Sequence, residues 1–342
     1  MKHVEVLIAS YLEPEYVDRI RPIDGVRVTY DPGLLPQPRY GSDHVGYPLQ
    51  RSPENERQWR EYLAGAEVLF DFDHTNLAIL NTLIPHVRWI QATSVGIGQL
   101  LIRTRLIAGP ITFTTARGIH AKPLADFAAM AILWFAKDGF RMIREQAARR
   151  WTRYCGRDVS GATVGIVGFG SIGREVAKVC RAMGMRVVAT SRTLRAGASD
   201  SDADQIISVS NLTALLGVAD YVVLAVPHTP QTERLLGGAE LAAMRPGAVL
   251  INVARGAVID EAALIAGLRD GHLGGAALDV LSMEPPAADN PLWSMPNVLI
   301  SPHSASTVTS ENARLTDLFC ENLLRYMRGE ALLNVFDRER LY

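Results

Sequence analysis

Residues 163–173 read Thr163-Val-Gly-Ile-Val-Gly168-Phe-Gly170-Ser-Ile-Gly173, and this stretch decides the fold of the chain. An apolar run leads into three glycines spaced G-x-G-x-x-G, and a helix-compatible run over residues 174–183 follows at once. A strand, a glycine turn and a helix, with a second strand within about 30 residues, form a specific dinucleotide-binding signal. The stretch therefore predicts a phosphate-binding turn.

Each glycine of this turn has a predicted role. Gly168 permits the tight turn, Gly170 lets the backbone approach a pyrophosphate, and Gly173 allows the helix to pack closely. The amides of Ser171 and Ile172 then point at the anionic oxygens. The alternative, a tight turn without a ligand, does not explain why the strand and helix flank the glycines.

The end of the second strand indicates which dinucleotide binds. The chain has Thr190-Ser191-Arg192-Thr193 there. An Asp or Glu would bind the ribose hydroxyls and repel a 2′-phosphate, whereas the Arg192 guanidinium and the hydroxyls of Ser191 and Thr193 suit a phosphate. The sequence favours NADP(H), with NAD(H) left open. In the alternative, Arg192 is a solvated loop residue and residues 199–202 (Ser-Asp-Ser-Asp) fold back to the ribose.

Short apolar runs alternate with helical patterns along almost the whole chain, which predicts an α/β protein with mostly parallel sheets. Helices are expected at residues 16–21, 53–64, 123–138 and 309–328, and the third is apolar nearly all round, which predicts burial. The last helix follows the completed second series of strands, so we expect it to pack on the first domain. Strands are expected at residues 6–9, 26–30, 68–71, 89–92 and 112–114, and then at 164–167, 186–189, 221–226, 249–252, 276–279 and 298–300.

Length and composition narrow the class further. The 342 residues suggest two domains at about 150 residues each. The chain has 35 Lys+Arg against 36 Asp+Glu, a net charge of −1, which argues against nucleic acid as a partner. Cys155, Cys180 and Cys320 lie far apart and form no C-x-x-C pair. This spacing indicates neither a disulfide framework nor a zinc ribbon, and it fits a protein of the reducing cytoplasm. The longest apolar run, residues 127–136, is shorter than the roughly 20 residues of a membrane span.

Residues 31–51 are rich in Pro and Gly and too long for an ordinary connection. They are predicted to form either a lid or a variable loop.

Three later segments carry Arg255, Glu284 and His303 after predicted strands or in the loops that follow them. In an open α/β sheet, ligands bind outside the carboxyl ends of the strands, so these side chains can converge. Singly, each is as well explained as a solvated loop residue. Together, and with the glycine turn upstream, they predict one reactive site.

These segments make the chain resemble the D-isomer-specific 2-hydroxyacid dehydrogenases over about residues 89–306, and the runs 226–232 (Val-Pro-His-Thr-Pro-Gln-Thr) and 244–247 (Met-Arg-Pro-Gly) add to the match. The resemblance implies two Rossmann-like doubly wound domains. A flavodoxin-like substrate-binding domain would comprise residues 1–119 and 307–342, and an inserted dinucleotide-binding domain residues 120–306.

The resemblance also implies the chemistry, the reduction of a 2-oxo acid to a D-2-hydroxy acid. Arg255 would hold the carboxylate and carbonyl oxygen of the substrate. His303 would be the general acid, and the base of the reverse reaction. Glu284 would pair with His303 and favour the imidazolium. The nicotinamide cofactor supplies the hydride.

Further contacts follow from the same resemblance. Asp279 would lie by the nicotinamide carboxamide. Ser94, Val95 and Gly96 resemble the substrate loop of the family, whose amides receive the carboxylate. The sequence departs from the usual pattern at Gly98, where many members have Asp, and at Asp126, where Glu is usual. The other residues expected along the cofactor are Val226, Pro227, Thr232, Val253, Ala254, His303 and Ala305.

Three expectations concern other partners and residues. The histidines, among them His44, His74, His86 and His228, lack metal-ligand spacing, so no metal is implied. His120 is expected to be a hinge or packing residue. The arm with residues 149–151 (Arg-Arg-Trp) contacts the twin subunit in the family, which implies a homodimer.

The leading hypothesis is a cytoplasmic, NADPH-preferring reductase of glyoxylate or hydroxypyruvate, since Val95-Gly96-Ile97 resembles those reductases. One alternative is an NAD-dependent dehydrogenase of another 2-hydroxy acid, phosphoglycerate included. Another is a nucleotide-sensing binding protein on the same fold. A formate dehydrogenase is disfavoured because that relative has Gln in place of Glu284.

Overall fold

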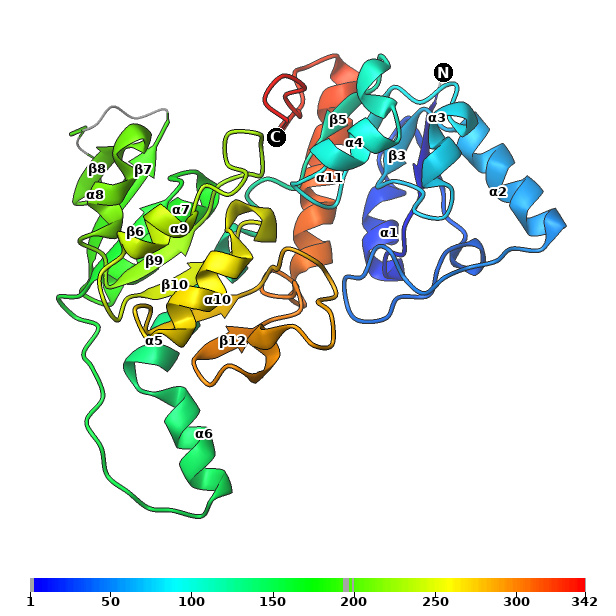
Figure 1. The fold of residues 1–342 in the computed structure, drawn as a ribbon. Helices are drawn as coiled ribbons and strands as arrows, with labels where there is room; N and C mark the ends of the chain where they lie inside the picture. Colours follow the sequence, from blue (N-terminus) through cyan, green and yellow to red (C-terminus); the bar gives the residue numbers. More distant parts are fainter. Residues whose placement is uncertain (1–2, 193–196, 199, 342) are drawn as a thin grey trace. The chain divides into compact units, whose positions relative to one another are not determined.

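The computed structural model describes residues 3–192, 197–198 and 200–341. The chain forms two compact units, one comprising Met1–Ile119 with Thr307–Tyr342 and the other His120–Ser306 (Figure 1). Each unit is an α/β structure built on a parallel sheet, which confirms the predicted fold class.

The first unit contains a five-stranded parallel sheet with the order β2-β1-β3-β4-β5, the order of flavodoxin-like folds. Helices α1 and α11 cover one face, and α2, α3 and α4 the other. The return of α11 to this unit confirms the expected place of the last helix. The bounds are β1 (Val4–Ile8), β2 (Val26–Thr29), β3 (Val68–Phe70), β4 (Trp89–Gln91), β5 (Thr112–Thr114), α1 (Pro14–Ile20), α2 (Pro53–Gly65), α3 (Leu80–Leu83), α4 (Gly98–Arg103) and α11 (Glu311–Arg328).

Helix α11 is held to this sheet by rings and by a buried polar network. Phe319 stacks on Trp89 with ring centroids 5.2 Å apart. Asn322 donates from Nδ2 to Gln91 Oε1 at 3.0 Å, and Thr114 Oγ1 donates to the same oxygen at 2.8 Å. All these side chains are buried. Since burying a polar group is costly unless it is hydrogen-bonded, this network ties one helix to two strands.

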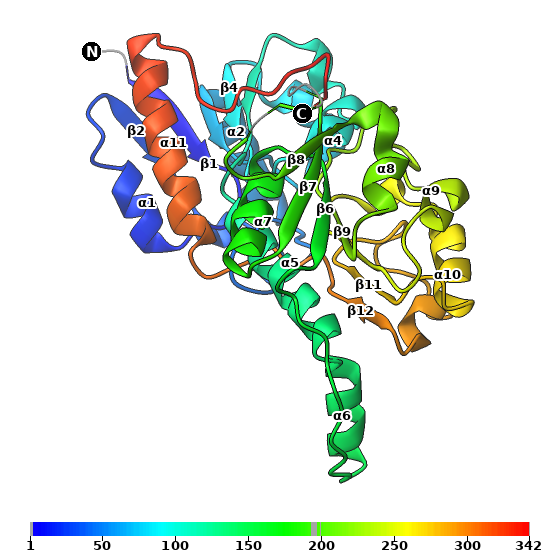
Figure 2. The ribbon, with the colours of Figure 1, turned by 90° about the vertical axis from the view of Figure 1, so that its left-hand side faces the viewer.

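The second unit contains a seven-stranded parallel sheet with the order β12-β11-β10-β9-β6-β7-β8. Helices α5 and α7 pack on one face, and α8, α9 and α10 on the other (Figure 2). The strands are β6 (Thr163–Val167), β7 (Arg186–Ser191), β8 (Gln205–Ser208), β9 (Tyr221–Leu224), β10 (Val249–Asn252), β11 (Gly275–Leu278) and β12 (Val298–Ile300). The helices are α5 (Ala121–Ala136), α6 (Gly139–Ala147), α7 (Ser171–Ala182), α8 (Leu212–Leu216), α9 (Gly238–Ala242) and α10 (Glu261–Arg269).

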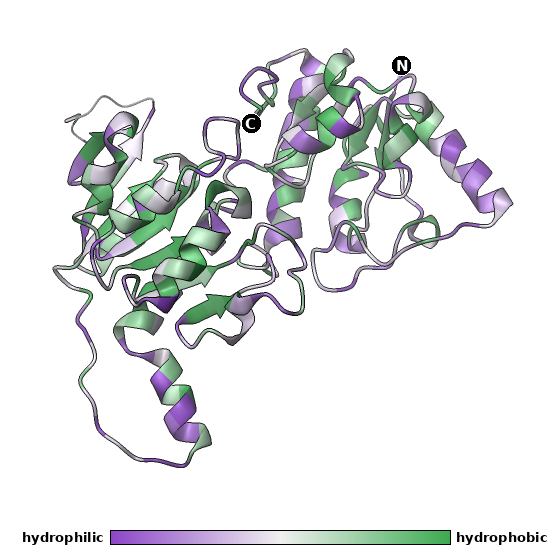
Figure 3. Cartoon of the chain, viewed as in Figure 1, coloured by the Kyte–Doolittle hydropathy of each residue, from purple (hydrophilic) through white to green (hydrophobic). Residues whose placement is uncertain are grey.

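Nearly continuous apolar runs explain why most of these strands could be predicted from the sequence. Strands covered by helices on both faces need apolar residues at successive positions rather than at alternate ones. Figure 3 shows the strands of both units in the colour of apolar residues. All five residues of β6 are buried.

The structure differs from the sequence prediction at several elements. The short helices α3, α4, α8 and α9 and the helix α10 were not predicted. Strand β8 was not predicted, because its four residues, Gln-Ile-Ile-Ser, contain only two apolar ones. Helix α6 was not predicted either. It begins after Asp138, whose carboxylate accepts from the Arg141 amide at 3.3 Å. Helix α5 was predicted to be buried nearly all round, yet Met130 and Leu133 are each 41% exposed. Within the described residues, no helix combines the length and apolarity needed to cross a membrane.

Candidate active site

The glycine turn joins β6 to the start of α7. Gly168 has φ +100°, a backbone conformation that glycine adopts without strain. A Cβ on Gly173 would lie 2.1 Å from the Gly168 carbonyl oxygen, so this glycine lets the helix close against the turn. A Cβ on Gly170 would meet nothing within 4 Å. The open side of Gly170, next to the first amides of α7 at Ser171 and Ile172, fits a pyrophosphate.

The end of β7 carries the residues expected at the ribose. Ser191 is buried and Arg192 is exposed, whereas Thr193 and Ser199 lie outside the described residues. Two acidic side chains lie nearby in sequence, and both are paired with Arg174 of α7. The Arg174 guanidinium bonds Asp200 at 2.9 Å and Asp202 at 3.3 Å.

Arg174 also favours the ionised form of Asp200. Its hydrogen bond holds the pKa of the Asp200 carboxyl below the usual range. Its guanidinium lies 4.6 Å from the ring centroid of Phe169, within the glycine turn. The two carboxylates therefore share the one positive charge of Arg174 beside the turn.

Glu284 and His303 form an ion pair in the second unit. His303 Nδ1 lies 2.7 Å from Glu284 Oε2, and Glu284 Oε1 accepts from the Leu281 amide at 3.1 Å. Burial alone would raise the pKa of the Glu284 carboxyl, but His303 and the Leu281 amide outweigh burial, and the pKa lies below its usual range. Glu284 is therefore ionised at neutral pH.

Arg255 follows β10 and is held by its neighbour Asn252. The fully buried Asn252 accepts from the Ala254 amide at 3.0 Å and donates to the Arg255 carbonyl at 3.1 Å. Burial lowers the pKa of Arg255, and the charges of Glu284 and Asp279 oppose that effect. A guanidinium stays protonated at neutral pH even so. A Cβ on Gly256 would lie 2.0 Å from the Leu281 carbonyl, so glycine allows this turn to touch the loop that carries Glu284.

Asp279, at the end of β11, holds the loop that carries His303. Its Oδ1 accepts from Ser301 Oγ at 2.7 Å and from the amides of Ser304 and Ala305, each at 2.9 Å. Its carbonyl accepts from the His303 amide at 2.9 Å. His303 has φ +54°, which a non-glycine residue adopts only when its surroundings impose it. The contacts with Asp279 supply that constraint.

The remaining residues predicted along the cofactor also follow strands of this sheet. Thr232 Oγ1 donates to the Pro227 carbonyl at 2.7 Å and accepts from the Thr229 amide at 2.8 Å, which closes the turn after β9. Val253 and Ala254 are buried, and Val226 and Ala305 are partly exposed. These turns meet the glycine turn at the carboxyl edge, where the strand order reverses between β6 and β9. Such a switch point is where open α/β sheets bind ligands.

Sequence reasoning missed two contributors at this edge. Asn252 could have been found, because an Asn at a strand end commonly hydrogen-bonds the backbone two residues on. The pairing of His228 Nε2 with Glu233 Oε2 could not be predicted, because the sequence of a short loop does not determine which of its side chains meet.

The first unit contributes the loop of Ser94, Val95 and Gly96 after β4. Ser94 and Gly96 are exposed. Within the described part of the chain, the three amides donate no hydrogen bond to the protein. The flanking amides do, Thr93 to Asp71 Oδ1 at 3.4 Å and Ile97 to the Val95 carbonyl at 3.1 Å. Successive amides without acceptors form a site suited to an anion.

Residues 31–51 are anchored to the same edge of the first unit. His44 Nδ1 lies 3.0 Å from Ser10 Oγ at the end of β1, and His44 Nε2 lies 3.0 Å from Asn312 Oδ1 on α11. Arg39 clasps Asp43 with Nε and Nη2 at 2.7 and 2.9 Å. The segment is therefore pinned at its middle, whether it serves as a lid or as a variable loop.

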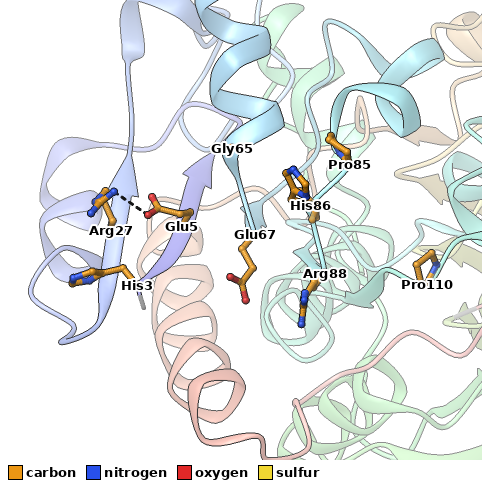
Figure 4. A pocket seen from close by; sticks show the side chains of 10 residues that line it. His3, Glu5, Arg27, Gly65, Glu67, Pro85, His86, Arg88 and Pro110 are labelled. Atoms are coloured by element: carbon orange, nitrogen blue, oxygen red, sulfur yellow. Dashed lines mark ion pairs between the residues drawn. The ribbon is translucent and has the colours of Figure 1, made fainter. Parts of the chain in front are cut away.

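A pocket of about 640 Å³ lies at the other edge of this sheet, where the strands begin (Figure 4). Glu5 and Arg27 form an ion pair of 3.0 Å on its wall. None of the predicted site residues lines it. Among the described residues, no group of three or more His, Cys, Asp or Glu side chains could hold a metal ion.

The glycine turn, the switch point and the His303–Glu284 pair define an oxidoreductase with a nicotinamide dinucleotide cofactor. The family model described as D-isomer specific 2-hydroxyacid dehydrogenase, NAD binding domain, matches residues 129–305. The chain belongs to the D-isomer specific 2-hydroxyacid dehydrogenase family, which confirms the resemblance seen in the sequence.

Relatives over most of the chain agree. A glyoxylate reductase from Korarchaeum cryptofilum is 33% identical over 261 residues, 75% of this chain and 77% of that protein. An (S)-sulfolactate dehydrogenase from Chromohalobacter salexigens is 36% identical over 217 residues, 63% of this chain and 70% of that protein. A D-isomer specific 2-hydroxyacid dehydrogenase from Xanthobacter autotrophicus Py2, solved with NADPH and MES, has a TM-score of 0.77 at 27% identity, with all of both chains covered.

The buried Asp71–His74 pair, next to the Ser94 loop, makes stability depend on pH. His74 Nε2 lies 3.3 Å from Asp71 Oδ2. Burial opposes both charges, but the pair outweighs it. The pKa of Asp71 is lowered, and that of His74 is raised by Asp71 with Asp73 and Asp43 nearby. The contribution of His74 is complete below a pH of about 6.5 and is lost as the pH rises through the raised value.

We therefore expect His74→Gln to lower the urea midpoint more at about pH 5.5 than at about pH 8.5. Below about pH 4, the contribution of Asp71 fades as its carboxyl is protonated. The control is His86→Gln, an exposed histidine of the same unit, measured in the same urea series. An equal loss at both pH values would contradict the pairing.

Proposed function

We propose that this protein reduces a small 2-oxo acid, of the glyoxylate or hydroxypyruvate type, to the D-2-hydroxy acid and prefers NADPH. The observation that carries the proposal is the 2.7 Å pair of His303 and Glu284 at the sheet edge that bears the glycine turn. The names of the glyoxylate reductase relatives support this substrate class.

We assign one task to each side chain. The cofactor, when bound, supplies the hydride. Glu284 occupies His303 Nδ1, which leaves Nε2 to donate its proton to the carbonyl oxygen of the substrate. The ionised Glu284 holds the ring through Nδ1, so that Nε2 keeps one direction. In the reverse direction, the neutral ring accepts the hydroxyl proton.

Arg255 and the Ser94–Gly96 amides recognise the substrate in their respective units. The Arg255 fork orients the 2-oxo acid by its oxygens. The three amides, which have no acceptor within the described chain, receive the carboxylate. Asp279 keeps the His303 loop in place, since it accepts four hydrogen bonds from residues 301–305.

The preference for NADPH rests on the end of β7. Arg192 is exposed there, next to the hydroxyl of Ser191. Asp200 and Asp202, which would repel a phosphate, share the positive charge of Arg174, which weakens that repulsion. The related Xanthobacter autotrophicus protein was solved with NADPH, which supports the same choice.

A homodimer is the second part of the proposal. Helix α6 and the chain after it extend away from the sheet of their unit (Figure 2). Met142, Ile143 and Trp151 of this arm are 45%, 56% and 98% exposed. Exposed apolar groups of this size mark a protein interface, and a second copy of the chain would cover them. The cytoplasmic location stays a prediction.

The first experiment measures NADPH and NADH oxidation with glyoxylate, hydroxypyruvate, pyruvate, phenylpyruvate and sulfopyruvate. His303→Asn removes the proton donor, so kcat should fall about 100-fold to 10,000-fold. His86→Asn is the control and should retain full rates. Retention of most activity by His303→Asn would overturn the general-acid role, and wild-type turnover of only a few per hour would favour a nucleotide sensor.

A second test concerns the cofactor. Arg192→Asp should reduce the kcat/KM ratio of NADPH to NADH by about 10-fold or more, because a charge-assisted bond to the 2′-phosphate is replaced by repulsion. Arg186→Asp alters the charge at the other end of the same strand and should leave the ratio unchanged. An unchanged ratio in Arg192→Asp would sink the assignment.

Sedimentation equilibrium tests the dimer. The wild type should have twice the chain mass at micromolar concentration, and Ile143→Asp with Trp151→Asp should shift it to the monomer, because buried carboxylates without partners are costly. Tyr47→Asp, at a residue 58% exposed in the other unit, is the control. A wild-type monomer would refute the proposal.

A further inference from the structure

Gly98 begins α4 two residues after the last amide of the Ser94–Gly96 loop, and the C-terminal segment lies directly on it. A Cβ at position 98 would lie 2.9 Å from the Leu341 carbonyl oxygen and 3.3 Å from Leu341 Cβ. Heavy atoms rarely approach a Cβ so closely. A larger residue at position 98 would therefore displace Leu341 from its observed position. Gly98 is buried as a result.

The segment that delivers Leu341 is fixed along its length. Phe336 is buried, and its amide donates to the Phe113 carbonyl at 2.8 Å. Arg338 donates to the carbonyl of Gly109 at 2.8 Å and also to those of Ile107 and Ile111. The Leu341 amide then donates to the Asp337 carbonyl at 2.8 Å, which closes a turn. Leu341 is thus held from the core outward.

Helix α4 is short, and its start is held by apolar packing and not by a capping side chain. It has six residues, and no side chain caps its first turn. The loop before it is held through the Ser94 carbonyl, which accepts from the Ala116 amide at 3.2 Å. Leu341 also packs its side chain against the core cluster that contains Ile97 and Leu101. Leu341 therefore adds a close backbone contact that limits movement of α4 at its loop end.

We propose that the segment Asp337–Leu341 is a positioning element for the substrate loop, and that residue 98 is glycine so that Leu341 can seat against the start of α4. This inference rests on the proposed function, because it assigns the loop amides to the substrate carboxylate. The carboxylate is bound equally in the ground state and in the transition state. A displaced loop therefore raises KM and leaves kcat nearly unchanged.

Kinetics of four chains test the proposal: the wild type, Gly98→Ala, a chain ending at Glu339, and the chain that combines both changes. Gly98→Ala and the shortened chain should each raise the KM of the 2-oxo acid by about 3-fold to 30-fold, with kcat changed by less than about 3-fold. In the shortened chain, Gly98→Ala should add little, because the contact that it disturbs is already gone. Gly65→Ala, at a helical glycine with nothing within 4 Å of a Cβ, is the matched control.

Additive effects of the two changes, or an unchanged KM in either single variant, would overturn the proposal. Leu341→Ala in the full-length chain guards against a folding defect in the shortened one and should raise KM in the same direction. A fall in kcat with unchanged KM would also contradict a role in holding the carboxylate.

Hydrogen exchange separates failure of this inference from failure of the proposed function. The Ala116 and Leu101 amides, which donate to Ser94 and Ile97, should exchange faster in the shortened chain than in the wild type. Unchanged exchange would refute the positioning role even in an active enzyme. A wild type that reduces no 2-oxo acid, yet shows faster exchange on shortening, would refute the substrate assignment alone.

Discussion

Parallel strands buried on both faces leave polar side chains one place to gather, the edge at which the strands end. In the second unit, every strand from β6 to β12 except β8 delivers a residue of the candidate site at its carboxyl end. The glycine turn, Arg255, Asp279 and His303 are thus brought together by one geometric rule. The chemistry of the protein depends on the burial of the sheet beneath it.

At that edge, hydrogen bonds between charged side chains and their neighbours hold the site residues in place. Asp279 holds the His303 loop through its Oδ1, which accepts three hydrogen bonds, and through its backbone carbonyl. Glu284 is aligned by the Leu281 amide and in turn aligns His303. Near the glycine turn, Arg174 gathers two carboxylates in the same manner. Each functional side chain therefore has a neighbour that fixes its direction, as a preorganised site requires.

Much of this arrangement could be predicted from the sequence, because it rests on local patterns. Runs of apolar residues identified the strands, with β5, β10 and β12 placed to the residue. The glycine spacing identified the dinucleotide turn. What could not be predicted depends on how loops and helices are arranged in space: the His228–Glu233 pair within one loop, the exposed face of α5, and the contact of Leu341 with Gly98. Helix α6 was not predicted because its apolar residues Met142 and Ile143 are exposed, so no core pattern marks them.

The first unit is discontinuous, since the second lies between Ile119 and Thr307 in the chain. Phe319 and Asn322, which complete the core around Trp89 and Gln91, are therefore made last. At about 5–20 residues per second, the ribosome needs roughly 10–40 s to pass from the first part to the second. During that interval α1 alone covers one face of the sheet in the nascent first unit, because α11 has not yet been made, while the second unit folds as a continuous segment. The order of synthesis thus makes the dinucleotide-binding unit the earlier folding intermediate, and the first unit the one that needs protection from aggregation.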